Sequence, residues 1–302
     1  MSKIFVVGSI NVDYVMEITH LPLLGETLAS QSFLMNFGGK GANQAVALAK
    51  QNEEVYLIGC VGQDTMGKDS IQSLKHYGVH TDFIKTIKNQ NTGLAFILVE
   101  NQNNRILLHA GANQNIQKQQ ILEALSLAQP SDYLLTQLET NLDMVYFAIK
   151  EAKKRQMKVV FNPAPVQSID MKILDFVDIL IVNEIECEML LHCKYDQKEQ
   201  VQACIQKHQI SAFIVTLGEK GAMVYHQQKV AIYPALAVKV IDTTAAGDTF
   251  IGAFLSEWMR TFNLSQSMQY AIVASALTCT TFGAQKSIQT RKEIQKYMDK
   301  YF

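Results

Sequence analysis

One acidic residue, Asp248, stands among small residues at the beginning of an apolar pattern that predicts a helix over Gly247–Thr261. Ala245, Ala246 and Gly247 leave backbone N–H groups open at the helix start, where the helix dipole favours an anion. A carboxylate there can accept a proton from a hydroxyl beside a bound phosphate, a pairing that phosphoryl transfer needs. The alternative is that Asp248 only complements the dipole in the first helical turn, and the segment alone favours neither interpretation.

Residues 38–43 form a second segment of interest, with the sequence Gly-Gly-Lys-Gly-Ala-Asn, at the start of a predicted helix over Ala42–Lys50. Glycines let the backbone approach a ligand closely, and the helix start presents free N–H groups. Lys40 and Asn43 add side-chain donors, so the segment suits a small molecule rich in hydroxyl groups. The alternative, a tight strand-to-helix turn without a ligand, has similar weight.

Asn183 and Glu186 follow the apolar run Ile179–Val182 and lie three residues apart, on one face of a predicted helix. They could hold Mg²⁺ through water molecules, because Mg²⁺ keeps most of its hydration. An N-cap Asn with a capping-box Glu fits the same spacing. The spacing alone therefore favours the cap.

The charge balance limits the class of partner. The chain has 302 residues, with 27 Lys and Arg against 28 Asp and Glu, a net charge of −1 and a pI of about 6.7. This near-neutral balance argues against nucleic acid or an anionic membrane as the main partner and favours a small-molecule ligand. No uncharged apolar stretch reaches the roughly 18 residues that a membrane span needs.

The five cysteines have no regular spacing, so they do not make a disulfide framework, and the chain is predicted to be reduced and cytoplasmic. Cys187, His192 and Cys193 lie close together, but no second ligand pair stands at zinc-like spacing. The sequence also lacks G-x-x-x-x-G-K-[ST], G-x-G-x-x-G after a strand, G-x-S-x-G and H-E-x-x-H. These absences weaken the hydrolase, zinc-protease and dehydrogenase interpretations.

The elements that must position these residues alternate between strand and helix patterns. Short β-rich runs, most of them continuous and apolar, predict buried strands over Ile4–Gly8, Val55–Cys60, Leu94–Val99, Tyr133–Thr136, Val159–Asn162, Ile179–Val182 and Phe213–Leu217. Val238–Ile241 is also predicted to be a strand. Helical patterns are found over Ala42–Lys50, Met66–Tyr77, Gln117–Ala128, Leu142–Gln156, Glu184–Leu191, Lys198–His208, Gly247–Thr261, Ser265–Thr280 and Arg291–Lys300. This alternation predicts an α/β fold, with a central, mostly parallel β-sheet flanked by helices.

Two stretches, Val12–Phe37 and Thr92–His109, are extended and have no helix between their strand-like pieces. We expect them to form a small β-sheet that stands off the main one, with Gly38 and Gly39 as a hinge. The alternative is a pair of edge hairpins on the main sheet. Because no long linker separates the parts, the sequence predicts a single domain over residues 1–302, with lid segments at approximately 12–38 and 92–110.

Together these segments resemble the PfkB family of carbohydrate kinases. Residues 38–43 are similar to the first family signature, and residues 242–250 to the second, D-T-x-x-A-G-D-x-F. Further blocks resemble the members that phosphorylate ribose, and these are Gly8–Asp13, His109–Asn113, Gln137–Glu139, Asn162–Pro165, Thr216–Gly218 and Gly283–Gln285. The resemblance extends over nearly the whole chain in the family's order.

The resemblance implies an α/β body with a small β-sheet lid, and a homodimer in which the lids of two subunits interlock. The implied activity is ATP-dependent phosphorylation of D-ribose at the 5-hydroxyl, giving ribose 5-phosphate and ADP, with Mg²⁺ and K⁺ as cofactors. The alternatives are a kinase for 2-deoxyribose, another small sugar or a nucleoside, and a sugar-binding regulator without activity. The hypothesis of an inactive sugar-binding regulator is disfavoured, since binding alone needs no base in an anion hole. The residues that argue against it are Asp248, Ala246, Gly247, Asn183 and Glu186.

The resemblance also assigns roles to single residues. Asp248 would be the base, within an anion hole of Ala245, Ala246 and Gly247. The sugar site would be Asn11, Asp13, Gly39, Lys40, Asn43, Glu139 and Asp248, with apolar lid contacts from Ala95, Ile97 and Leu108. ATP would contact Asn183, Thr216, Gly218, Gly221, Ala246 and Gly247. Mg²⁺ would be held through water by Asn183 and Glu186, and K⁺ by Asp242, Thr244, Thr278, Thr281, Gly283 and Ser287, several of them through carbonyl oxygens.

The chain departs from the family pattern at three positions. Ile272 stands where a His or Asn often contacts the nucleotide, so the adenine contacts there are left open. Thr281 and Lys286 replace an Arg and a Pro found in related enzymes. These last two positions belong to the cation loop and not to the sugar site.

Overall fold

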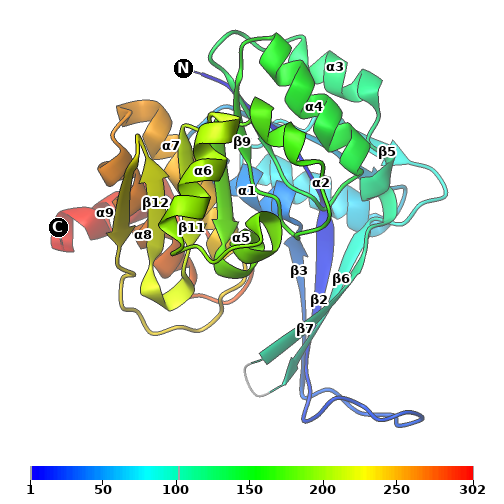
Figure 1. The fold of residues 1–302 in the computed structure, drawn as a ribbon. Helices are drawn as coiled ribbons and strands as arrows, with labels where there is room; N and C mark the ends of the chain where they lie inside the picture. The colour runs from blue at the N-terminus through cyan, green and yellow to red at the C-terminus, as the bar shows by residue number, and fades with distance from the viewer. Residues whose placement is uncertain (1, 101–102, 302) are drawn as a thin grey trace.

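The main sheet is built from the apolar runs of the sequence. The computed structural model describes residues 2–100 and 103–301, and its nine-stranded sheet has the order β13-β12-β11-β10-β9-β8-β1-β4-β5 (Figure 1). Neighbours from β11 to β5 pair in parallel, whereas β12 is antiparallel to both β11 and β13. The strands are β1 (Ile4–Val7), β4 (Val55–Gly62), β5 (Ile84–Ile87), β8 (Tyr133–Thr136), β9 (Lys158–Phe161), β10 (Ile179–Asn183), β11 (Ala212–Thr216), β12 (Ala222–His226) and β13 (Lys229–Tyr233).

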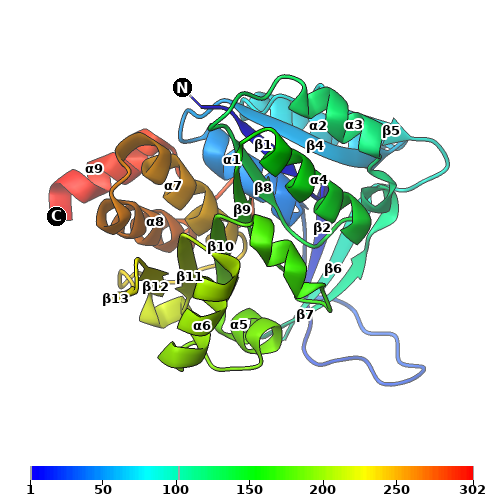
Figure 2. The ribbon, with the colours of Figure 1, turned by 45° about the horizontal axis from the view of Figure 1, so that its top comes forward.

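Helices cover both faces of this sheet (Figure 2). Neighbouring residues of β1 show why: Ile4 and Val6 belong to one buried apolar cluster, and Phe5 and Val7 to the other. The first cluster includes apolar residues of α1 (Lys40–Ala49), α2 (Thr65–His76), α7 (Ala246–Thr261), α8 (Leu264–Thr278) and α9 (Arg291–Tyr301). The second includes residues of α3 (Lys118–Leu125), α4 (Leu142–Lys154), α5 (Glu184–Leu191) and α6 (Lys198–His208).

A separate four-stranded sheet projects from the body beside β1 and α1 (Figure 1). Its order is β3-β2-β6-β7, with strands β2 (Asn11–Glu17), β3 (Ser32–Gly38), β6 (Gly93–Glu100) and β7 (Asn103–His109). The two extended stretches of the sequence thus form a small sheet of their own, and they are not edge hairpins of the main one. The predicted α/β fold class is confirmed. Residues 101 and 102 of the predicted lid segment, and the predicted domain ends at 1 and 302, lie outside the described residues.

The parallel strands end at one edge of the main sheet, and this edge collects the residues singled out above. Glu139 follows β8, Asn183 ends β10 and Thr216 ends β11, while β2 continues from β1 into the small sheet. Ligands of open parallel sheets bind at the carboxyl ends of the strands. The topology therefore predicts one site at this edge, between the small sheet and the start of α7.

One predicted strand is wrong. Val238–Ile241 forms no strand; it belongs to a loop between β13 and α7, and Val240 and Ile241 are largely exposed. The backbone N–H groups of Ile241 and Asp242 both donate to the Cys279 carbonyl, so this loop is tied to the end of α8 and not to a sheet. An apolar β-branched run satisfies strand propensity, but here no neighbouring strand is available to pair with it.

In the part of the chain that the structure describes, no helix is both long and apolar enough to cross a membrane. Its cysteines are free, and no group of three or more His, Cys, Asp or Glu side chains among the described residues could hold a metal ion. The predicted cytoplasmic location stays a prediction.

Candidate active site

The anion hole at the start of α7 differs from the predicted one at Ala246, whose N–H donates to the Thr243 carbonyl at 3.2 Å and is not open. Ala245 is the N-cap and adopts a left-handed conformation, with φ of 62°, and no side chain caps the helix. Within the described part of the chain, the N–H groups of Gly247 and Asp248 have no hydrogen-bond partner. A Cβ added at Gly247 would meet no atom within 4 Å, so open space adjoins these donors. The helix start is therefore ready to receive an anion.

The Asp248 carboxylate lies beside this hole and is nearly buried, with 9% of the residue exposed. Two amides of α1 hold it: Asn43 Nδ2 donates to Oδ2 and Gln44 Nε2 donates to Oδ1, each at 2.9 Å. Burial raises the pKa of Asp248 above its ordinary value, although the charge of Lys40 and the two amides act in the opposite direction. A carboxylate with a raised pKa is a better proton acceptor than a solvated one. The sequence predicted Asn43 as a site residue but missed Gln44.

Glu139 forms the centre of the predicted sugar pocket. Its Oε2 accepts hydrogen bonds from Ser9 Oγ (2.5 Å), from the Lys40 backbone N–H (3.0 Å) and from Asn11 Nδ2 (3.5 Å). Asn11 is held in turn by Asn113, whose Nδ2 donates to Asn11 Oδ1 at 2.7 Å. Ser9 and Asn113 orient the pocket although the sequence predicted no role for either. Their only signal was their place inside the blocks that resemble the family.

Asp13 is the third carboxylate of the pocket, and it is 7% exposed. Burial, together with the nearby charges of Glu139 and Asp248, raises its pKa to about 7, although Lys40 counteracts them. Gly38 makes room for this side chain, because a Cβ at position 38 would lie 2.1 Å from Asp13 Oδ2. A sugar hydroxyl would supply the hydrogen bond that this carboxylate lacks among the described residues.

Lys40 carries the positive charge of the site. Burial lowers the pKa of Lys40, but the charges of Asp248, Glu139, Glu186 and Asp13 outweigh burial and leave the pKa raised. The ammonium therefore stays protonated at neutral pH. One cation balances a cluster of buried and half-buried carboxylates, among which charge interactions are stronger than in water.

The predicted apolar contacts lie on the pocket face of the small sheet. Asp13 pairs with Ala95, and Ala95 pairs with Leu108, so these three side chains share one face. Ile97 pairs with Val15 one row further out on that face. Ala95 and Ile97 are buried, whereas Leu108 is 51% exposed at the edge strand.

Two cavities meet at the anion hole. The smaller, of about 220 Å³, is lined by Lys40, Asn183, Glu186 and Asp248; the larger, of about 680 Å³, is lined by Gly218, Gly221, Phe250 and Ile272. Both are also lined by Thr216, Thr243, Ala246 and Gly247. A nucleotide in the larger cavity would thus place its phosphates at the donors of α7. Ile272 contributes an apolar wall there.

Asn183 and Glu186 form the capping box that their spacing favoured. Glu186 N–H donates to Asn183 Oδ1 at 2.8 Å, and Asn183 N–H donates to Glu186 Oε2 at 2.9 Å. Both residues nevertheless line the smaller cavity. Burial raises the pKa of Glu186, although the Asn183 hydrogen bond and Lys40 counteract it. A divalent cation in this cavity would stabilise the charged carboxylate, so the pair fits a Mg²⁺ ion held through water.

The predicted K⁺ ligands are brought together only in part. Asp242 Oδ1 accepts from the N–H and the hydroxyl of Thr244, and its Oδ2 accepts from Gly283 N–H at 3.0 Å. Asp242 therefore joins two of the predicted loops. The hydroxyl of Thr278 is buried against Thr249, and that of Ser287 donates to the Ala284 carbonyl. The carbonyl groups of the same two residues also have partners, since Thr278 accepts from the Thr281 N–H and Ser287 from Gln289 Nε2.

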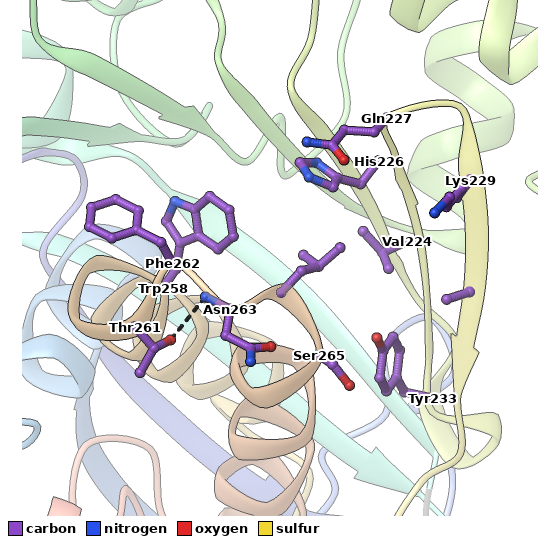
Figure 3. A pocket seen from close by; sticks show the side chains of 12 residues that line it. Val224, His226, Gln227, Lys229, Tyr233, Trp258, Thr261, Phe262, Asn263 and Ser265 are labelled. Carbon is purple, nitrogen blue, oxygen red and sulfur yellow. Dashed lines mark hydrogen bonds between the residues drawn. The ribbon is translucent and has the colours of Figure 1, made fainter.

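A third hollow, of about 630 Å³, lies away from these residues, between the β12–β13 hairpin and the turn from α7 to α8 (Figure 3). It contains none of the predicted site residues. Its described lining has His226, Lys229 and Tyr233 as titratable groups and includes no carboxylate. It therefore lacks a base like Asp248 next to an anion hole.

A cavity that meets a carboxylate-rich pocket at an open helix start is the arrangement that a small-molecule phosphotransferase needs. A family profile described as "pfkB family carbohydrate kinase" matches residues 1–291, and the chain belongs to this family. The chain is a sugar kinase.

The relatives include a ribokinase of Haemophilus influenzae, 38% identical over 97% of each chain, and a deoxyribokinase of Salmonella typhi, 33% identical over 98% of each chain. A solved structure of Arabidopsis thaliana ribokinase complexed with ribose and ATP is 30% identical over 98% of each chain, with a TM-score of 0.87.

Replacement of Asp13 by Asn tests the charge crowding in the pocket. Between pH 4 and 7 the folded protein binds a proton at Asp13 that the unfolded chain does not, so wild-type stability falls as pH rises through this window. Asp13→Asn removes this pH-dependent loss of stability. The linkage relation limits the resulting increase in the free energy of unfolding above pH 7 to about 4 kcal/mol. We expect the variant without ligand to be more stable than wild type at pH 8 and to lose most of that advantage at pH 4.

Urea unfolding at the two pH values measures the difference. Asp82→Asn, at an exposed carboxylate, is the control and should change stability little at either pH. An equal stability difference for Asp13→Asn at pH 4 and pH 8 would contradict the raised pKa of Asp13.

Proposed function

We propose that the chain is a ribokinase, which transfers the γ-phosphoryl group of ATP to the 5-hydroxyl of D-ribose. The observation that carries the proposal is the position of Asp248, whose nearly buried carboxylate adjoins both the polar pocket and the donors at the start of α7. The identity to ribokinases over nearly the full length supports the ribose specificity.

In the proposed reaction, Asn11, Asp13, Lys40 and Glu139 hold the sugar hydroxyls and orient the 5-hydroxyl toward Asp248. The Asp248 carboxylate accepts the hydroxyl proton as the oxygen attacks the γ-phosphorus. The N–H groups of Gly247 and Asp248 stabilise the negative charge on the transferred group, and the Lys40 ammonium adds to this. Thr216, Gly218 and Gly221 border the cavity for the rest of the nucleotide.

Two cations belong to the proposal. Asn183 and Glu186 would hold Mg²⁺ through water, and Mg²⁺ would supply charge neutralisation for the ATP phosphates. The loops around Asp242, Thr244 and Gly283 would hold K⁺, together with carbonyl groups near Thr278, Thr281 and Ser287. Because Asp242 ties these loops together beside α7, a cation there would steady the backbone of the anion hole.

We also propose one domain in which segments 12–38 and 92–110 act as a lid and pair with the lid of a second copy. The face of the small sheet turned away from the sugar exposes large apolar side chains: Phe33 is 54% exposed, Met35 50% and Leu107 66%. Contiguous exposed apolar side chains of this kind mark an interaction surface. A second copy would bury them.

Leu107→Glu tests the dimer, because it places a charge in the middle of the proposed contact. Wild type should sediment as a dimer, and Leu107→Glu should sediment as a monomer at the same concentration. Leu127→Glu, which charges an exposed leucine outside the small sheet, should remain a dimer. A monomeric wild type would refute this arrangement.

Asp248→Asn tests the base. The variant keeps a side chain of the same size but cannot accept the proton, so kcat should fall on the order of 10²–10⁴-fold. ATP binding, followed by calorimetry, should persist because the N–H groups of α7 are retained. Near-normal turnover would exclude Asp248 as the base.

A substrate panel tests the specificity. An alternative kinase for 2-deoxyribose is favoured by one observation, the 33% identity to deoxyribokinases over almost the whole chain. ADP release should be fastest with D-ribose among ribose, 2-deoxyribose, fructose, adenosine and pseudouridine, and it should rise when K⁺ is added. Faster turnover of 2-deoxyribose than of ribose would show that the chain is a deoxyribokinase. Equal rates with and without K⁺ would contradict the proposed K⁺ site.

A further inference from the structure

Side-chain amides form a hydrogen-bonded chain that ends on the catalytic carboxylate. Gln44 of α1 donates from Nε2 to Asp248 Oδ1 at 2.9 Å. Gln137, which follows β8, donates from Nε2 to Gln44 Oε1 at 2.5 Å. Gln44 Nε2 also donates to Asn162 Oδ1 at 3.2 Å, and Asn162 Nδ2 donates to the Ile181 carbonyl at 2.9 Å. Asp248 is thus connected to the residues that follow β8 and β9 and to the middle of β10.

The surroundings of Gln44 permit one orientation of its amide. Nε2 faces two acceptors, the Asp248 carboxylate and Asn162 Oδ1, while Oε1 faces the Gln137 donor. A reversed amide would place Oε1 against both acceptors and Nε2 against another N–H donor. Gln44 is fully buried and Gln137 is 1% exposed, so both amides are shielded from bulk solvent.

Gln137 is kept as an amide at a cost. Its Oε1 is buried and has no hydrogen-bond partner within the described residues. Gly8 makes room for it, because a Cβ at position 8 would lie 2.3 Å from Gln137 Oε1. A buried polar atom without a partner destabilises a fold. The amide is explained if its other end, Nε2, is needed to orient Gln44.

We propose that Gln44 is the positioning residue of the base: it fixes one oxygen of Asp248 while Gln137 and Asn162 fix Gln44. The inference rests on the proposed role of Asp248. Asn43 holds the other oxygen, so two donors from one turn of α1 set the plane of the carboxylate. Gln44 lines neither of the two cavities, and it therefore acts through Asp248 and not on the substrates.

A positioning role has a signature in the pH profile. Charged groups face Asp248 from several elements: Lys40 on α1, Glu139 after β8, Asp13 on β2 and Glu186 on α5. The Gln44 hydrogen bond stabilises the ionised carboxylate, so its loss should raise the pKa of Asp248 further. The acidic limb of the kcat profile should then move to higher pH. A residue with only a packing role would leave that limb unchanged.

Gln44→Met, which keeps the length of the side chain and removes both donors, is the test variant. We expect kcat to fall on the order of 10- to 100-fold, because small displacements of a catalytic group have effects of this size. The sugar KM should stay close to the wild-type value, and the acidic limb should move to higher pH. Gln137→Met should give the same changes to a smaller extent.

Gln51→Met is the matched control. Gln51 is a fully buried glutamine just beyond α1 that donates to the Gln289 carbonyl and accepts from the Tyr270 hydroxyl. Neither partner is one of the proposed site residues. Its replacement should lower the melting temperature without shifting the pH profile. If Gln44→Met does not fold, the kcat and pH profile of Gln137→Met provide the test instead.

The sugar that wild type turns over fastest in the substrate panel serves for all variants. The identity of that sugar tests the proposed function, whereas the ratio of variant to wild type tests the positioning role. Wild-type kcat with an unmoved acidic limb in Gln44→Met, or in Gln137→Met if only that variant folds, would overturn the inference. An equal shift of the limb in Gln51→Met would overturn it as well.

Discussion

The site depends on four carboxylates gathered around one ammonium, that of the half-buried Lys40. Asp13, Glu139, Glu186 and Asp248 all act on Lys40, and burial raises the pKa of Asp13, Glu186 and Asp248. This excess of negative charge suits a polyhydroxyl ligand, which donates hydrogen bonds, and repels an anionic one. The phosphates therefore need separate donors, and the start of α7 supplies them on the other side of Asp248. Segregation of donors and acceptors thus assigns one region to the sugar and the other to the nucleotide.

Much of the fold could be predicted because the strands are buried on both faces, so their sequences are continuous apolar runs. Tyr133–Thr136 is such a run, and the structure gives it the predicted bounds. The rule fails at Val238–Ile241, a β-branched run interrupted by Lys239, which borders the larger cavity and not a sheet. The prediction also omits β13, an edge strand whose residues are exposed or half-buried although four of the five are apolar.

Some residues of the candidate site could likewise be predicted from the local sequence, and others could not. Residues inside the two signatures, such as Asp248 and Asn43, could be predicted because local sequence determines a helix start and a glycine-rich turn. Gln44 could not, since its partners lie 93 to 204 residues away along the chain. Asn183 and Glu186 show the opposite case: spacing correctly favoured a cap, and only the fold reveals that the same cap borders a cavity.

The small sheet joins the body through a row in which Asn11 pairs with Gly38 on one side and with Gly93 on the other. Neither position can carry a side chain, because polar side chains of the pocket occupy the space that a Cβ would need: Asp13 beside Gly38, and Asn11 and Asn113 beside Gly93. Asn11 belongs to this row, whereas Asp13 lies two residues further out on the same strand. Asn11 therefore keeps a fixed position relative to the body, because its row is where the small sheet joins it, whereas the position of Asp13 depends on the orientation of the small sheet.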